Sequence, residues 1–271
     1  MIKQVKLRVG IPTTQVGLGT SRLHYLQGTE RQRLLGAALD YGISHFDTAP
    51  VYGDGLAERS MGQFLRGRRD RCVLVTKYGV PPDPVAESMP FLFPAWRIVR
   101  SMGRRTGLFN SSLPPLTASG LLRSVEHSLR RLATDYIDIL LLHVPTVARL
   151  QDAQMLIEQL EQLRAKGTIR AFGVSGDWAD LAPIVLGQSA SLGQVIQTGE
   201  GEWQEDYQPD ITYGAISQGR QSYFQDALST EVVEQRLINA LRKRPQGVVL
   251  VSTTKIDNLK RLVQVAQAGQ Q

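Results

Sequence analysis

Short β-type runs alternate with amphipathic helical stretches along most of the sequence, and this alternation constrains the fold more than any other feature. The predicted strands cover residues 16–18, 44–46, 72–76, 137–142, 169–174, 194–197, 211–215 and 248–251. The predicted helices cover residues 30–41, 56–65, 117–132, 153–166, 178–185, 230–244 and 256–266. Eight strand-led units of this kind favour parallel strands closed into a (β/α)8 TIM barrel of the α/β class.

Two of these units are irregular. The stretch between residues 197 and 211 is too short for a full loop and helix, so the sixth βα unit is expected to be reduced. A long proline-rich loop follows the third strand, over residues 77–116. An open doubly wound sheet is the competing fold, but Gly17-Leu18-Gly19-Thr20 lacks the third glycine of its usual turn. We expect one barrel domain over residues 1–271.

Composition excludes several classes of protein. The 271 residues are 42% hydrophobic, which suits one large core, and the lone Cys72 cannot form an internal disulfide. No apolar run approaches a membrane span and no signal peptide is evident, so we expect a cytoplasmic protein with no membrane partner. The net charge is +6, but the arginine clusters lack interleaved aromatic residues. We therefore expect an anionic cofactor and no nucleic acid.

Four polar residues stand where a barrel would bring them together. Asp47, Lys77 and His143 each come directly after a predicted strand, and Tyr52 lies in the loop after Asp47. Singly, they would suit a turn, a solvent-facing lysine, a structural histidine and a packed tyrosine. In a barrel the carboxyl ends of all strands meet at one mouth, so their joint placement indicates an active site there.

These residue types suit the reduction of a carbonyl group. Hydride delivery leaves an alkoxide, which needs a proton, and a free tyrosine with a pKa of about 10 donates poorly at neutral pH. The ammonium of Lys77 would lower that pKa, and Asp47 would hold Lys77 in its charged form. His143 would orient the carbonyl oxygen by a hydrogen bond, and Tyr52 would be the general acid.

The same segments resemble the aldo-keto reductase family. Asp47-Thr48-Ala49-x-x-Tyr52-Gly53, followed by Glu58 and Gly62, is similar to the family signature. Thr76-Lys77 and Leu141-Leu142-His143 are similar to its other motifs. The resemblance implies that Asp47, Tyr52, Lys77 and His143 form a catalytic tetrad, and that NADPH rather than NADH is bound, without a Rossmann fold.

The resemblance also assigns residues to the cofactor. Ser175 and Gln197 match residues that hold the carboxamide, and Tyr213 matches the tyrosine that stacks on the nicotinamide. Gly176 stands where the family has asparagine. The phosphate groups are assigned to the loop after the last strand and the start of the last helix, namely Ser252, Thr253, Thr254, Lys255 and Asn258. Hydroxyls, helix amides and the ammonium of Lys255 would bind these anions.

The substrate pocket is the least constrained part of the site. We expect no counterpart of the long C-terminal loop found in the family that the sequence resembles, so residues 80–116 are expected to form much of the pocket wall. Tyr25, Trp96 and Trp203 are candidates to bind substrate. Core packing or a partner surface would suit these aromatic side chains equally well.

We therefore expect an NADPH-dependent reductase that converts an aldehyde or ketone to an alcohol, with a small-molecule carbonyl substrate and no metal ion. A cofactor-binding sensor with little turnover is the alternative, because the sixth unit is short and Gly176 lacks an amide. A third interpretation is a lyase or isomerase that uses Lys77 as a Schiff base. The oligomeric state is left open.

Overall fold

The structure is a computed structural model that describes residues 1–83, 85, 113–201, 203, 207–216 and 229–269. Eight parallel strands close into a barrel in the order β10-β3-β4-β5-β6-β7-β8-β9. Their bounds are β3 Val16–Gly19, β4 His45–Asp47, β5 Val73–Tyr78, β6 Ile137–His143, β7 Ile169–Ser175, β8 Ile196–Gly199, β9 Ile211–Tyr213 and β10 Val248–Val251. The predicted TIM barrel is confirmed.

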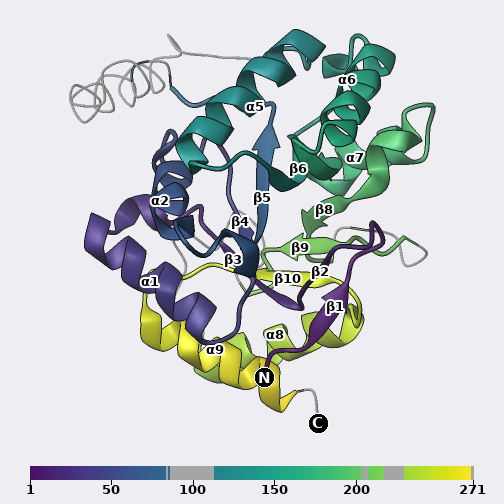
Figure 1. The fold of residues 1–271 in the computed structure, drawn as a ribbon. Helices are drawn as coiled ribbons and strands as arrows, with labels where there is room; N and C mark the ends of the chain where they lie inside the picture. Colours follow the sequence, from purple (N-terminus) through teal and green to yellow (C-terminus); the bar gives the residue numbers. More distant parts are fainter. Residues whose placement is uncertain (84, 86–112, 202, 204–206, 217–228, 270–271) are drawn as a thin grey trace, which may run out of the picture.

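Helices surround the strands, with α1, α8 and α9 on one side and α5, α6 and α7 on the other (Figure 1). Their bounds are α1 Gly28–Asp40, α2 Leu56–Leu65, α5 Ala118–Leu132, α6 Ala153–Ala165, α7 Trp178–Val185, α8 Thr230–Lys243 and α9 Ile256–Ala268. Thr117 caps α5 as predicted, since its side chain accepts a hydrogen bond from the Gly120 N–H at 3.1 Å. Among the described residues, none of the helices is both long and apolar enough to span a bilayer.

Side chains alternate between the inside and the outside of the barrel along each strand. In β5, Val73 and Val75 belong to the interior cluster, whereas Leu74 packs against the outer helices. The same alternation puts Lys77 inside, two residues after Val75. Because of this alternation, polar side chains at the ends of several strands point into the barrel interior.

An N-terminal hairpin closes the barrel at the end opposite its mouth. Strands β1 (Gln4–Lys6) and β2 (Pro12–Thr14) pair antiparallel. Val5, Leu7 and Ile11 from this hairpin join the interior cluster. The hairpin was not predicted from the sequence, although its apolar residues alternate with polar ones.

The sixth unit is reduced, as predicted. Between β8 and β9, the described residues 200, 201, 203 and 207–210 contain no helix. Arg244, which follows α8, is buried on the outer side of β9. Its guanidinium lies 4.3 Å from the centre of the Trp203 ring, donates to Thr212 Oγ1 at 3.0 Å and pairs with Glu200. This cluster covers strand surface that a helix covers in the complete units.

A buried histidine in the interior makes stability depend on pH. His45 is fully buried, with Nδ1 3.1 Å from Thr13 Oγ1, and burial followed by the charge of Lys77 lowers its pKa from 6.5 to about 3. The unfolded chain therefore binds a proton at a pH where the folded chain does not. This contribution to stability is complete above the unfolded pKa and is lost as the pH falls through 6.5 toward 3.

We expect protonation of His45 in the unfolded chain to lower the free energy of unfolding by about 2 kcal/mol between about pH 7.5 and pH 5. In His45→Gln, the free energy of unfolding measured in urea should fall less steeply over that range. His127→Gln, which changes an exposed histidine on α5, is the control and should follow the wild type. Parallel curves for His45→Gln and the wild type would show that His45 is not the titrating group.

Candidate active site

The four predicted catalytic residues lie at one end of the barrel. Asp47, Lys77 and His143 stand at or near the carboxyl ends of β4, β5 and β6, at inward-facing positions. Tyr52 lies in the loop between β4 and α2 and is partly exposed. The strand ends therefore bring together residues that are up to 96 positions apart, from Asp47 to His143.

Asp47 and Lys77 form a buried ion pair. Lys77 Nζ lies 2.7 Å from both carboxylate oxygens of Asp47 and 3.0 Å from the carbonyl oxygen of Thr48. The Lys77 side chain is 1% exposed, and burial lowers its pKa while Asp47 opposes that effect. Three acceptors match the three N–H donors of an ammonium, which favours the charged form of Lys77.

Tyr52 and His143 lie against this ion pair. Lys77 Nζ is 5.1 Å from the centre of the Tyr52 ring, and the ring centres of Tyr52 and His143 are 6.2 Å apart at an interplanar angle of 89°. Burial, then the charges of Lys77 and Arg149, lower the pKa of His143 from 6.5 to about 3. At neutral pH His143 is therefore a neutral hydrogen-bonding group.

A chain of hydrogen bonds joins the catalytic and cofactor candidates. Gln197 Nε2 donates to Asp47 Oδ2 at 2.8 Å, and Ser175 Oγ donates to Gln197 Oε1 at 2.6 Å. Both side chains are buried and face the interior from β7 and β8. The carboxylate that holds Lys77 thus also orients an amide and a hydroxyl that could bond a second amide group.

Tyr213 occupies an inward-facing position at the end of β9 and is partly exposed. Its carbonyl oxygen accepts a hydrogen bond from the Glu200 N–H at 2.8 Å. At Gly176, a Cβ atom would meet its nearest neighbour at 3.4 Å, so the missing side chain leaves ordinary space there. Since β9 follows β8 in the barrel, the partly exposed Tyr213 stands on the strand next to that of Gln197.

The predicted phosphate residues gather after β10, at the start of α9. Ser252 Oγ lies 3.3 Å from the Gly19 carbonyl oxygen, and the Lys255 N–H donates to Thr253 Oγ1 at 3.1 Å. Lys255 is exposed at the N-terminal cap of α9. Helix amides, hydroxyls and an ammonium suit an anion, whereas the acidic Asp257 in the first turn opposes one.

The three predicted substrate-binding residues lie in different surroundings. Tyr25 follows β3 and is 71% exposed. Trp203 packs against the outer cluster of α5, α6 and α7 and against Arg244. Trp96 lies outside the described residues, as does most of the long loop after β5. The assignment of all three to substrate stays a prediction.

Two networks at the site were not predicted. Glu58 of α2 is fully buried, accepts from Thr76 Oγ1 at 2.6 Å and pairs with Arg131 at 2.7 Å, so it supports the strand residue before Lys77. Among the described residues, Arg149, after β6, donates to backbone carbonyl oxygens alone. Glu58 belongs to the quoted signature, but nothing in the sequence indicated the partners of Arg149.

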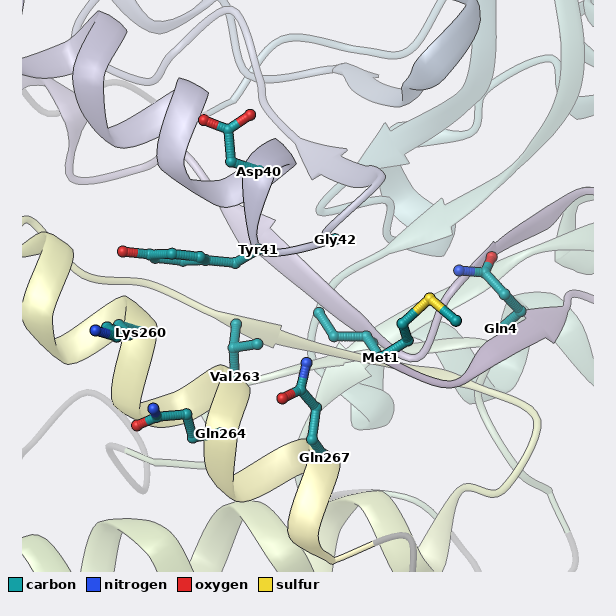
Figure 2. Close-up of a pocket in the computed structure, with 10 residues that line it drawn as sticks. Met1, Gln4, Asp40, Tyr41, Gly42, Lys260, Val263, Gln264 and Gln267 are labelled. Atoms are coloured by element: carbon teal, nitrogen blue, oxygen red, sulfur yellow. The ribbon is translucent and has the colours of Figure 1, made fainter.

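A separate pocket of about 480 Å³ lies at the opposite end of the barrel. Figure 2 shows Tyr41, just after α1, across the pocket from Lys260 and Gln264 of α9, whereas the Asp40 carboxylate points away from them. Its lining contains none of the candidate catalytic or cofactor residues. This pocket is therefore separate from the site predicted from the sequence.

The chain belongs to the aldo-keto reductase family, because the model of the Aldo/keto reductase family matches residues 15–190. The match includes Asp47, Tyr52, Lys77 and His143 but ends before Gln197. Pyridoxal 4-dehydrogenase of Microbacterium luteolum is 30% identical over 190 residues, which cover 63% of this chain and 54% of that protein. This chain spans about half the length of the curated relatives it matches.

Solved structures agree with the fold. An aldo-keto reductase from Bacillus halodurans superposes with a TM-score of 0.72 at 20% identity, over 98% of this chain and 91% of that chain. One from Klebsiella pneumoniae, in complex with NADPH, gives a TM-score of 0.68 at 23% identity, over 98% and 90%. At these low sequence identities, the structural similarity shows the barrel fold alone.

Proposed function

We propose that the protein reduces an aldehyde or a ketone to an alcohol with NADPH, and that Tyr52 donates the proton. The observation that carries this proposal is the buried ammonium of Lys77, held on Asp47 and 5.1 Å from the centre of the Tyr52 ring. A positive charge at this distance favours the phenolate and so makes the hydroxyl a better acid. Membership of the aldo-keto reductase family supports the same chemistry.

Each side chain has a separate role in this proposal. Tyr52 gives its proton to the carbonyl oxygen as negative charge develops there. Lys77 lowers the cost of the phenolate that remains, and Asp47 keeps Lys77 charged and in place. His143 is neutral, so it orients the carbonyl oxygen by a hydrogen bond without competing as a proton donor.

The cofactor assignment rests on two groups of residues that fit the parts of NADPH. Ser175 and Gln197 offer a hydroxyl and an amide for the carboxamide, and Tyr213 offers a ring face for the nicotinamide. The hydroxyls after β10, the first turn of α9 and Lys255 suit the phosphates. When bound, NADPH supplies the hydride. The complex of the Klebsiella pneumoniae enzyme with NADPH supports this choice of cofactor.

The alternative is a protein that binds the cofactor with little turnover. The short connection between β8 and β9 and the missing amide at position 176 favour it, because both reduce the groups that could hold the nicotinamide. A Schiff base at Lys77 is less well supported. The Lys77 ammonium already donates to three oxygen atoms, which leaves no free electron pair for attack on a carbonyl.

Titration with NADPH and with NADH, followed by fluorescence, tests cofactor binding, and NADPH oxidation with a panel of aldehydes, ketones and quinones tests turnover. We expect saturable NADPH binding below millimolar concentration and turnover of at least one carbonyl class. Failure to bind either cofactor at millimolar concentration would contradict the proposal. Binding without turnover on the whole panel would favour the alternative function.

Lys255, at the N-terminal cap of α9, and Lys260, within α9, give a matched pair of variants for this titration. Lys255→Ala should raise the Kd for NADPH about tenfold and leave that for NADH nearly unchanged, since only NADPH carries the 2′-phosphate. Lys260→Ala removes an ammonium beside the pocket at the far end of the barrel and should change neither value. Equal weakening of both cofactors by Lys255→Ala would remove Lys255 from the 2′-phosphate site.

A further inference from the structure

Arg149 is a buried arginine beside the active site, and its hydrogen-bond partners in the described part of the chain are all backbone carbonyl oxygens. It lies in a short 3-10 helix after β6 and is 8% exposed. Nε donates to the Pro114 oxygen at 3.0 Å, and Nη2 donates to the Gly79 oxygen at 2.5 Å. Nη1 donates to the oxygens of His143 at 3.1 Å and Val144 at 2.5 Å.

These oxygens come from three separate segments of the barrel mouth. Gly79 follows β5, Pro114 precedes α5, and His143 and Val144 end β6 and begin its loop. No carboxylate pairs with Arg149 within the described part of the chain. A planar guanidinium presents donors in a fixed fork, so it can hold several carbonyls in one plane where a lysine could not.

The backbone that Arg149 holds is strained at the residue next to His143. Val144 has a φ of 52°, in the left-handed region that β-branched residues avoid, and it precedes Pro145, which disfavours helical backbone angles. Such a conformation persists only where its surroundings fix it. Here the Val144 N–H donates to the Ser175 oxygen at 2.7 Å, and Arg149 holds the Val144 oxygen.

The segment after β5 packs closely against the end of β6. Gly79 has a φ of 130°, and a Cβ atom built on it would lie 2.7 Å from the His143 oxygen and 3.4 Å from Arg149 Nη2. A side chain at position 79 would therefore push against the backbone of His143. Glycine here allows the two strand ends to approach and share one guanidinium.

We propose that Arg149 is a positioning residue for the reduction, which fixes the strained backbone of His143 and Val144 and so orients the His143 imidazole toward the substrate carbonyl. This inference rests on the proposed function, since it assigns His143 the carbonyl as its partner. The bonds to Gly79 and Pro114 extend the same support to both described ends of the long loop after β5. Arg149 also contributes to the lowered pKa of His143, which keeps the imidazole neutral.

Arg69 offers a matched control at the other end of the same two strands. Its guanidinium donates to the Cys72 oxygen at 2.8 Å and the Tyr136 oxygen at 3.1 Å, just before β5 and β6. It also pairs with Asp138, which keeps Arg170 as a second partner if Arg69 is removed. Arg69→Met should therefore lower thermal stability and leave kcat nearly unchanged.

The test compares Arg149→Met with Arg69→Met in steady-state carbonyl reduction, well below the unfolding temperature of either. We expect Arg149→Met to lower kcat at least about tenfold, with the Kd for NADPH within about twofold of the wild type. Arg69→Met should keep kcat within about twofold. If Arg149→Met is too unstable to assay, Arg149→Lys keeps the charge without the fork and should still lower kcat several-fold. Wild-type kcat in Arg149→Met, or in a folded Arg149→Lys, would overturn the proposal.

Hydrogen exchange gives a readout that does not depend on activity. Without Arg149 the Val144 N–H should lose protection, whereas in Arg69→Met its protection should stay as in the wild type. If the wild type reduces no carbonyl, the proposed function fails and this exchange experiment alone decides whether Arg149 holds the segment. Unchanged protection at Val144 in Arg149→Met would then overturn the positioning role as well.

Discussion

Tyr52→Phe is expected to lower kcat for carbonyl reduction at least about a hundredfold, with the Kd for NADPH unchanged. The variant keeps the ring beside Lys77 and His143 and removes only the hydroxyl that supplies the proton. General acid catalysis contributes about 10²–10⁴ in rate, so the lower limit corresponds to about 2.7 kcal/mol of transition-state stabilisation. Steady-state kinetics on the best carbonyl substrate, with a parallel cofactor titration, measures both quantities.

Tyr78→Phe is the matched control for this loss. Tyr78 ends β5, and its hydroxyl lies 3.0 Å from both the oxygen and the nitrogen of Thr117, on the outer side of the barrel. Removing that hydroxyl should lower stability slightly and leave kcat within about twofold. Full activity in Tyr52→Phe would refute Tyr52 as the acid, and an equal loss in both variants would point to a general effect on the fold.

Lys77→Met should abolish measurable reduction and destabilise the fold by about 3–5 kcal/mol. The substitution leaves the Asp47 carboxylate buried without its ammonium, and an unpaired buried charge is costly. It also removes the positive charge that makes Tyr52 a better acid. Urea unfolding measures the first effect, and kcat at saturating NADPH measures the second.

The double variant Asp47→Asn with Lys77→Met separates charge pairing from catalysis. Since neither charge remains, the double variant should recover much of the stability that Lys77→Met loses. It should nevertheless stay inactive, because the tyrosine still has no ammonium beside it. Recovery of activity along with stability would mean that Lys77 serves the fold and has no role in the reaction.

The sequence predicted the barrel well because two local properties define its elements. These are the spacing of apolar residues along helices and strands, and the alternation of inward and outward side chains along each strand. The bounds predicted for α2, α7 and β10 are those observed. The convergence of Asp47 and Lys77 followed from the rule that parallel strand ends meet at one mouth. The hairpin of β1 and β2 was missed, although Val5, Leu7 and Ile11 carry the alternation of a strand.

Contacts across the barrel and contacts to backbone could not be predicted in this way. The bond between Gln197 and Asp47 depends on two side chains that reach each other across the interior from β8 and β4. The partners of Arg149 are carbonyl oxygens, which every residue carries, so no complementary charge in the sequence identified them. Strain at Val144 likewise arises from the loop geometry and has no signature in a valine followed by a proline.

The most direct test of the central claim is the transfer of labelled hydride from NADPH to a carbonyl. The wild type is incubated with NADPH that carries deuterium at the transferred position, together with each aldehyde and ketone of the panel, and the products are analysed by mass spectrometry. We predict an alcohol that carries one deuterium on the former carbonyl carbon. The absence of any deuterated alcohol across the panel, from a protein that binds NADPH, would contradict the account.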